Sequence, residues 1–445
     1  MVSTVHRHRR PSLRGGLPGH YMFRFDRESL VGWAWLALIG SCYLWGENLL
    51  EAERRIALHA PPLFGRFAWH PVGGLIVAIA IAGLVVFACD RHFQRLSWPR
   101  LIVVSISSAA LFAAALAGSG GLGGLTSPLL GPHDYLPAVS QIVSPVDFLN
   151  GFARRLGDYP IHVRGHPPGT VLVLWGMDRL GLGGAGWAAA TMIAAGASAS
   201  GAALLATKEI AGEKLARRCA PFLILSPAAI WIATSADALF AGVSAWGVAL
   251  VVLSTGRKGR TSDLLAFLGG ALFGAALFLS YGVVPLAAIA LAAGVYQGRP
   301  KPLVIATVAV LLIAAAFGAG GFWWLDGLRA TLTEYRLGVS QTRPAAFFAV
   351  NNLAAFSVAV GPAVWIGLSY LKRSPLWLIA GATLVAIVAA DLSGLSRGEV
   401  ERIWLPFVPW LSVAVAAIPD AARRRWLGAQ AFLAIAVQAG VATPW

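Results

Sequence analysis

The sequence predicts an all-α, polytopic membrane protein, and three observations support this fold class. Hydrophobic residues make up 57% of the 445 residues and charged residues only 12%, whereas an ordinary soluble domain has roughly 25% charged residues. Apolar stretches follow one another along the chain, each close to the ~20 residues that cross a bilayer as a helix. No polar stretch is long enough for a separate soluble domain. We therefore expect about 12 to 14 transmembrane helices in one domain over residues 30–445.

The net charge and the cysteines indicate which binding partners and sites the protein can have. The net charge of +15 lies in the segments between apolar stretches, where it orients a chain across a membrane, so membrane lipid is an expected partner and nucleic acid is not. The three cysteines lie in or at the ends of apolar segments without paired spacing. This pattern favours neither a disulfide framework nor a zinc site.

The first part of the chain sets the orientation. Residues 1–29 contain six arginines and lack a short apolar region followed by a cleavage site, which predicts a retained cytoplasmic tail. Spans are expected at 30–46, 71–89 and 101–118, and the basic segment 90–100 between the last two is cytoplasmic by the positive-inside rule. The third span then delivers residues 119–166 to the outside.

The outer loop 119–166 is the longest polar segment, and long loops are usually functional or disordered. Its apolar residues recur at spacings of three and four from Leu136 to Phe152. This periodicity predicts two short amphipathic helices in the membrane interface. Ser144 and Pro145 separate them, as the N-cap and first-turn residue of the second helix.

The remaining spans depend on how residues 167–207 cross the membrane. Two crossings would place every later basic segment outside, whereas one net crossing, with 169–181 dipping in and returning, places all of them inside. We prefer one crossing. It gathers the loop 119–166 and the segments 235–237, 280–282, 323–346 and 393–402 on the outer side. The later spans are expected at 221–234, 236–254, 264–279, 282–297, 302–322, 347–369, 376–392, 403–418 and 427–443.

The first candidate catalytic residue is Asp134, in the motif His133-Asp134-Tyr135 that follows a Gly-Pro turn. A carboxylate held at a membrane rim can act as general base on a hydroxyl acceptor, with His133 and Tyr135 as candidate substrate contacts. The alternative is a helix N-terminal charge that the helix dipole favours. Spacing alone leaves both interpretations open.

The second motif contains His162, Arg164 and His166 directly before Pro167-Pro168 and an apolar run. The prolines are typical of a helix start, whereas the basic side chains indicate binding. Together with His133 and Asp134 they would provide enough donors for a divalent metal, but the sequence does not favour one and predicts no certain cofactor.

The third motif places Arg397, Glu399, Glu401 and Arg402 directly before an apolar run. An arginine at such a rim can hold a phosphate through paired hydrogen bonds, and a glutamate can hold the arginine in place. A solvated connection with weak local ion pairs is the alternative.

Two residues at the starts of apolar runs complete the candidates. Asp237 follows Ser235, a pattern for which a helix cap is the favoured interpretation. Tyr281, in Ser280-Tyr281-Gly282, is a candidate substrate contact on the outer side.

In their order along the chain, these motifs resemble those of the GT-C glycosyltransferases, notably the protein O-mannosyltransferase-like branch. His133-Asp134-Tyr135 is similar to the family's outer-loop acidic motif, and His166-Pro167-Pro168-Gly169 to its Pro-Pro motif. Ser235-Ala236-Asp237 resembles the Asp found two spans later, and the string from Arg397 to Pro406 resembles a motif of related bacterial members.

The resemblance implies an inverting transfer of a sugar from a polyprenyl-phosphate donor to a glycan, lipid or protein acceptor, on the outer side of the cell membrane. Asp134 would be the general base. Arg402 or Arg397, with Arg164 and His166 contributing, would stabilise the departing phosphate. The alternative is a transporter or flippase of a lipid-linked sugar or another cell-envelope precursor, which also needs outer arginines but no carboxylate base.

Overall fold

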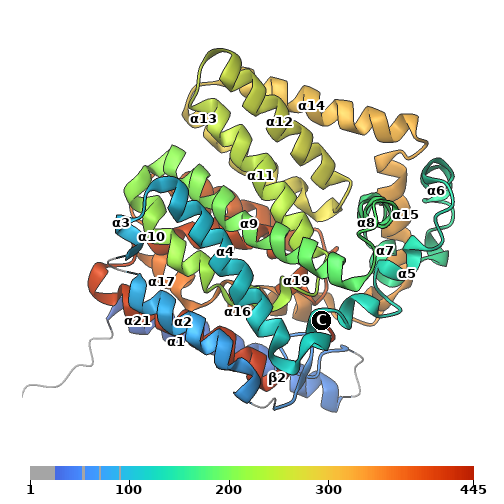
Figure 1. Cartoon of the computed structure of the whole chain (residues 1–445). Helices are drawn as coiled ribbons and strands as arrows, with labels where there is room; N and C mark the ends of the chain where they lie inside the picture. The colour runs from blue at the N-terminus through green and yellow to red at the C-terminus, as the bar shows by residue number, and fades with distance from the viewer. Residues whose placement is uncertain (1–25, 53–55, 70–71, 90–91) are drawn as a thin grey trace, which may run out of the picture.

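The computed structural model describes residues 26–52, 56–69, 72–89 and 92–445, and these residues form an almost entirely helical body (Figure 1). Most of the predicted tail 1–29 lies outside the described residues. The α-helices of the first half are α1 (Arg27–Glu51), α2 (Ile76–Ala88), α3 (His92–Arg95), α4 (Trp98–Ala117), α5 (Leu136–Val139), α6 (Pro145–Gly151), α7 (Ile161–Arg164), α8 (Gly169–Arg179), α9 (Ala185–Ala211) and α10 (Glu213–Ile224). Those of the second half are α11 (Asp237–Thr255), α12 (Gly259–Leu277), α13 (Ala287–Tyr296), α14 (Pro300–Ala319), α15 (Trp324–Leu337), α16 (Ala345–Val360), α17 (Pro362–Tyr370), α18 (Trp377–Leu392), α19 (Val400–Ile403), α20 (Val408–Leu411) and α21 (Asp420–Gly440).

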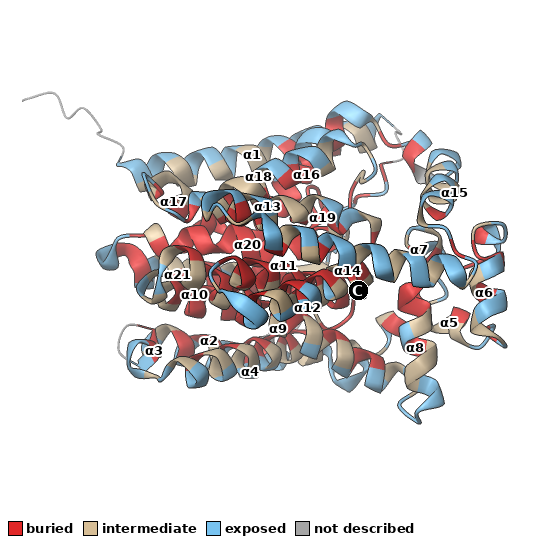
Figure 2. Ribbon diagram, turned by 90° about the horizontal axis from the view of Figure 1, so that it is seen from above, coloured by how far each residue is buried: buried red, intermediate tan, exposed pale blue. Residues whose placement is uncertain are grey.

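Helix α11 lies at the centre of the body and is the most buried of the long helices. It packs against α9 on one side and α12 on the other, and α12 in turn packs against α14. Small residues permit this close approach. A Cβ atom on Gly242 of α11 would lie 2.2 Å from the Ala195 carbonyl oxygen of α9, so only glycine fits there. Figure 2 shows the buried residues concentrated in the middle of the body, around α11 and α20.

The outer helices expose apolar side chains, as expected of helices that face lipid. α1 and α14 are largely exposed although both are apolar. Leu36 of α1 and Leu311 of α14 are two of their exposed apolar side chains. A helix that is apolar all round belongs in a protein core or a membrane. In the described part of the chain, five helices are long and apolar enough to cross a membrane, namely α1, α4, α9, α11 and α14. The chain is therefore a multi-pass α-helical membrane protein.

The predicted number of 12 to 14 full spans is too high for the described residues. A sixth span is formed only if α16 and α17 are counted together, and they are bent by 93° at Gly361. Four further apolar helices have 10–17 residues, fewer than the ~20 of a full crossing. The predicted span 403–418 is a series of short helices, in which 3₁₀ segments and α20 follow α19.

The basic segments meet at one end of the body. Arg217 of α10 donates to the carbonyl oxygens of Phe93 and Leu96 at 3.1 and 2.9 Å, and Arg218 pairs with Asp420. Lys301 pairs with Asp263 at 2.8 Å. The segment 208–218, predicted as a loop, is the tight junction between α9 and α10.

The opposite end carries the loop 119–166 together with α8, α15 and α19 (Figures 1 and 2). Two short helices, α5 and α6, lie where amphipathic helices were predicted, and the Ser144 hydroxyl accepts from the Asp147 amide at 3.3 Å. α8 is too short to cross a membrane. α9 runs from the end with the loop 119–166 to the end with the basic segments, so residues 167–207 contain one long helix. The segment 323–346 is not an open loop, because α15 occupies most of it.

Two short strands join distant parts of the chain at this end. β1 (Arg66–Phe67) pairs antiparallel with β2 (Val441–Ala442), and the Phe64 ring stacks on Trp445 with centroids 5.2 Å apart. We call residues 56–69 and 441–445 the strap. It places Trp445 beside the polar residues described next.

Candidate functional site

Two pairs of side chains from the loop 119–166 form the first half of the candidate site. Asp134 follows a tight turn and is 6% exposed; its Oδ2 lies 3.2 Å from Nδ1 of His162, and its Oδ1 accepts from the Tyr135 amide at 2.7 Å. The Tyr135 hydroxyl lies 2.8 Å from Nδ1 of His166. The motifs at 133–135 and 162–166, separate in sequence, are therefore one unit.

A hydrogen bond to a backbone carbonyl fixes the tautomer of His166. Nδ1 of His166 lies 2.8 Å from the His162 carbonyl oxygen, and because a carbonyl only accepts, this nitrogen carries the proton. Burial lowers the pKa of His166, so this imidazole is neutral at pH 7. Burial, with the charges of Asp237 and Asp134, holds the pKa of the Tyr135 hydroxyl well above its usual range. Tyr135 is thus a hydrogen-bonding group and not a base.

The second half of the site is a buried arginine between two carboxylates. The guanidinium of Arg402, on α19, pairs with Asp237 at the first residue of α11 and with Glu399 at 3.1 Å. Burial disfavours its charge, but Asp237 and Glu399 outweigh burial and hold the pKa of Arg402 above its usual value. Asp237 is therefore more than a helix cap, although the Ser235 hydroxyl also donates to it at 2.7 Å.

Glu399 is positioned by an unusual backbone. Its φ of 62° lies in the left-handed region, next to Gly398 at 92°, and a non-glycine residue is uncommon there. This conformation turns the carboxylate back toward Arg402 and also to within 3.6 Å of Arg343. Such backbone strain is found at sites where the surrounding structure holds a functional geometry.

Arg343 and Arg397 tie the loop after α15 to the segment before α19. Arg397 donates to the carbonyl oxygens of Ser340 and Arg343 at 2.6 and 3.0 Å, and Arg343 donates to that of Arg397. Arg397 thus binds backbone carbonyl groups. Arg343, which was not predicted from the sequence, is the second arginine that contacts the Glu399 carboxylate.

The strap covers this second half. The ring centroid of Trp445 lies 4.3 Å from the Arg402 guanidinium carbon and 5.9 Å from the His162 ring. Cation–π contacts of this kind favour arginine. Trp445 therefore connects the Asp134 and Arg402 halves, and its position near the site depends on the pairing of β1 with β2.

Glu401 holds the strap. Its Oε1 accepts from the Phe64 amide at 2.7 Å, the residue is fully buried, and burial raises the pKa of its carboxyl from 4.5 to about 7. It anchors the strap to α19.

The raised pKa of the Glu401 carboxyl predicts that the stability of the protein depends on pH. Because its carboxyl loses its proton at lower pH when the chain is unfolded, its contribution to the free energy of unfolding falls as the pH rises from about 4.5 to about 7. Glu401→Gln keeps an acceptor for Phe64 and removes the titration. We expect the variant to melt at a higher temperature than wild type at pH 8 and at a similar temperature at pH 4.5. A difference in melting temperature that is constant across this range would contradict the assignment.

Three other predicted site residues lie outside this cluster of contacts. Arg164 donates to the Tyr159 carbonyl oxygen at 2.6 Å and reaches Glu334 of α15 at 3.4 Å. Tyr281 packs edge-on against Trp324 of α15, with ring centroids 5.1 Å apart. The His133 side chain is exposed. Arg164 and Tyr281 thus position α15.

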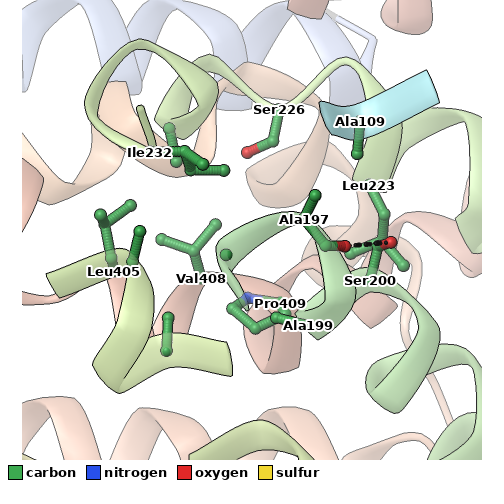
Figure 3. Close-up of a pocket in the computed structure, with 14 residues that line it drawn as sticks. Ala109, Ala197, Ala199, Ser200, Leu223, Ser226, Ile232, Leu405, Val408 and Pro409 are labelled. Atoms are coloured by element: carbon green, nitrogen blue, oxygen red, sulfur yellow. Dashed lines mark hydrogen bonds between the residues drawn. The ribbon is translucent and has the colours of Figure 1, made fainter. Parts of the chain in front are cut away.

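The helical interior beside the site is apolar. Figure 3 shows a pocket of about 40 Å³ between α4, α9, α11 and α20, with Ser200 and Ser226 as its polar lining residues. Ala238 and Leu405 of its wall come one and three residues after Asp237 and Arg402. The ion pair therefore lies at the edge of an apolar core. Among the described residues, no group of three His, Cys, Asp or Glu side chains could hold a metal ion.

Fold and site together define a multi-pass helical membrane protein with a polar, partly buried cluster at one end. No protein-family model, curated protein or solved structure matches the chain.

Proposed function

We propose that the protein is a GT-C-type glycosyltransferase that moves a sugar from a polyprenyl-phosphate donor to an acceptor hydroxyl. The observation that carries the proposal is the convergence of Asp134–His162 and Arg402–Asp237–Glu399 at one end of the helical body. An inverting transfer needs a base for the acceptor and a cation for the departing phosphate. The cluster offers both, next to apolar helices that suit a lipid chain.

The acceptor side is the Asp134–His162 centre. The acceptor oxygen attacks the anomeric carbon of the sugar, the bond from that carbon to the phosphate oxygen breaks, and the hydroxyl proton passes to this centre. The reaction inverts the configuration at the sugar, since the acceptor attacks from the face opposite the leaving phosphate.

The donor side is the pair of arginines on Glu399. Asp237 is 1% exposed and is a fixed partner of Arg402, whereas the Glu399 side chain is 21% exposed and lies between Arg402 and Arg343. A phosphate offers the same oxygens as a carboxylate and can replace Glu399 on both arginines. Glu399 therefore marks the position of the donor phosphate.

A transporter or flippase of a lipid-linked sugar is the second candidate, and one observation favours it. The bend of 93° between α16 and α17 is typical of the broken helices that line transporter sites. A flippase changes the leaflet of its lipid-linked sugar but leaves the glycosidic bond to phosphate intact.

The two functions differ in what happens to the donor. Purified protein is incubated in liposomes with polyprenyl-phosphate mannose, an accessible acceptor glycan and, separately, a fluorescent analogue that reports leaflet exchange. Mass spectrometry that finds free polyprenyl phosphate and an extended glycan supports transfer. If the analogue changes leaflet while the donor stays chemically unchanged, the protein is a transporter and not a transferase.

The position of the basic segments predicts which end of the protein faces outward. Because the basic segments lie at one end, the positive-inside rule places Thr261 and Lys372 in the cytoplasm and Thr126 and Ser396 outside. Cysteines substituted at these four positions should react with a membrane-impermeant maleimide from outside only at 126 and 396. The three native cysteines are buried and give little background. Labelling at position 372 in intact cells would mean that the protein has the opposite orientation in the membrane.

A further inference from the structure

The Asp134–His162 pair leaves one unoccupied nitrogen near the reacting groups. An ionised carboxylate only accepts hydrogen bonds, so the Nδ1 that lies 3.2 Å from Asp134 Oδ2 carries the proton of the neutral His162 ring. The other ring nitrogen, Nε2, then holds a free lone pair. Within the described part of the chain, Nε2 makes no hydrogen bond, while both Asp134 oxygens already accept one each.

The surroundings of His162 suit it for proton transfer. Its side chain is 16% exposed and that of Asp134 is 9% exposed, so the imidazole is the more accessible of the two groups. The Tyr135 and Trp445 rings lie 6.2 and 5.9 Å from it and limit its movement. Histidine is also the side chain that most readily takes and releases a proton near neutral pH.

We propose that Nε2 of His162 is the atom that accepts the proton of the acceptor hydroxyl, and that Asp134 orients this imidazole and stabilises the imidazolium. The proposal rests on the proposed transferase function and names its base. In the step, the acceptor O–H bond breaks and its proton forms a bond to Nε2. The acceptor oxygen bonds the sugar carbon, and the electrons of the carbon–phosphate-oxygen bond leave with the polyprenyl phosphate. Asp134 keeps its negative charge throughout.

Two substitutions separate the base from a structural role. His162→Gln keeps an N–H group that can bond Asp134 but has no basic nitrogen, and His162→Ala leaves room for an added imidazole. Transfer from polyprenyl-phosphate mannose by both variants should fall about 100-fold or more. Added imidazole should restore at least about tenfold of the rate to His162→Ala, because it supplies the missing base, and should not help Asp134→Asn.

The controls distinguish the two claims. His92→Ala, at the opposite end of the protein where the side chain is exposed, should keep the wild-type rate with and without imidazole. Near wild-type rates for both His162 variants would overturn the assignment and leave the transferase function standing. Loss without imidazole rescue would make His162 a structural residue and would also overturn it. Absence of transfer by wild type would overturn the proposed function and this assignment with it.

Discussion

Asp134→Asn is expected to lower the rate of sugar transfer by about 10²- to 10⁴-fold, the usual contribution of general base catalysis, because His162 loses the carboxylate that supports it as the base. The protein stays folded. Asn has nearly the same size and can still accept from the Tyr135 amide, so the turn before α5 is kept. It lacks the negative charge that orients His162 and stabilises its protonated form. The initial rate with polyprenyl-phosphate mannose, measured at saturating donor, reports this loss.

Asp158→Asn is the matched control, because Asp158 belongs to the same loop and is exposed. Its rate should stay within about twofold of wild type, since surface substitutions usually have small effects. The binding of donor to Asp134→Asn should also change little, as the phosphate contacts lie on Arg402 and Arg343. An Asp134→Asn protein with wild-type turnover would mean that proton transfer does not depend on Asp134.

Arg402→Ala is expected to destabilise the fold by about 3–5 kcal/mol, the typical cost of removing one partner of a buried ion pair. Asp237 is 1% exposed and would be left with an unpaired charge, because its remaining partner is the Ser235 hydroxyl. Trp445 would also lose the cation beneath its ring. The free energy of unfolding in detergent, from denaturant titration, measures this cost.

A double variant tests whether the loss belongs to the ion pair. Asp237→Asn combined with Arg402→Met removes both charges, and buried pairs replaced by neutral groups often lose little stability. The double variant should therefore be more stable than Arg402→Ala. Arg154→Ala, an exposed arginine on the outer loop, should change the free energy of unfolding by less than about 0.5 kcal/mol. An equally small change in Arg402→Ala would mean that Arg402 is not held as described.

Hydropathy predicted the individual apolar helices well because an apolar run is a local property. The expected spans 101–118 and 236–254 correspond to α4 (Trp98–Ala117) and α11 (Asp237–Thr255). It did not predict where such runs break. The bend between α16 and α17 occurs at Gly361-Pro362, a pair that favours helix ends but is hidden inside a continuous apolar segment.

The site was only partly predictable for the same reason. Asp134, Asp237 and Arg402 could be selected, since charged residues beside apolar runs are costly and often functional. The pairing of Asp134 with His162 depends on how the loop folds across 28 residues. Trp445 reaches Arg402 only through the strand pairing of the strap, and neither its position nor that of Arg343 has a local signal. The sequence therefore indicates which residues carry chemistry but not which of them pair.

In the proposed function, the cluster breaks the bond between a sugar and polyprenyl phosphate. The most direct measurement is the release of free polyprenyl phosphate from synthetic polyprenyl-phosphate mannose by purified wild-type protein in liposomes, with Asp134→Asn in parallel. We expect release that depends on an acceptor glycan, a product of inverted anomeric configuration by NMR, and a rate at least about 100-fold lower in the variant. Intact donor after prolonged incubation with wild type, across mannose, glucose and arabinose donors, would contradict it.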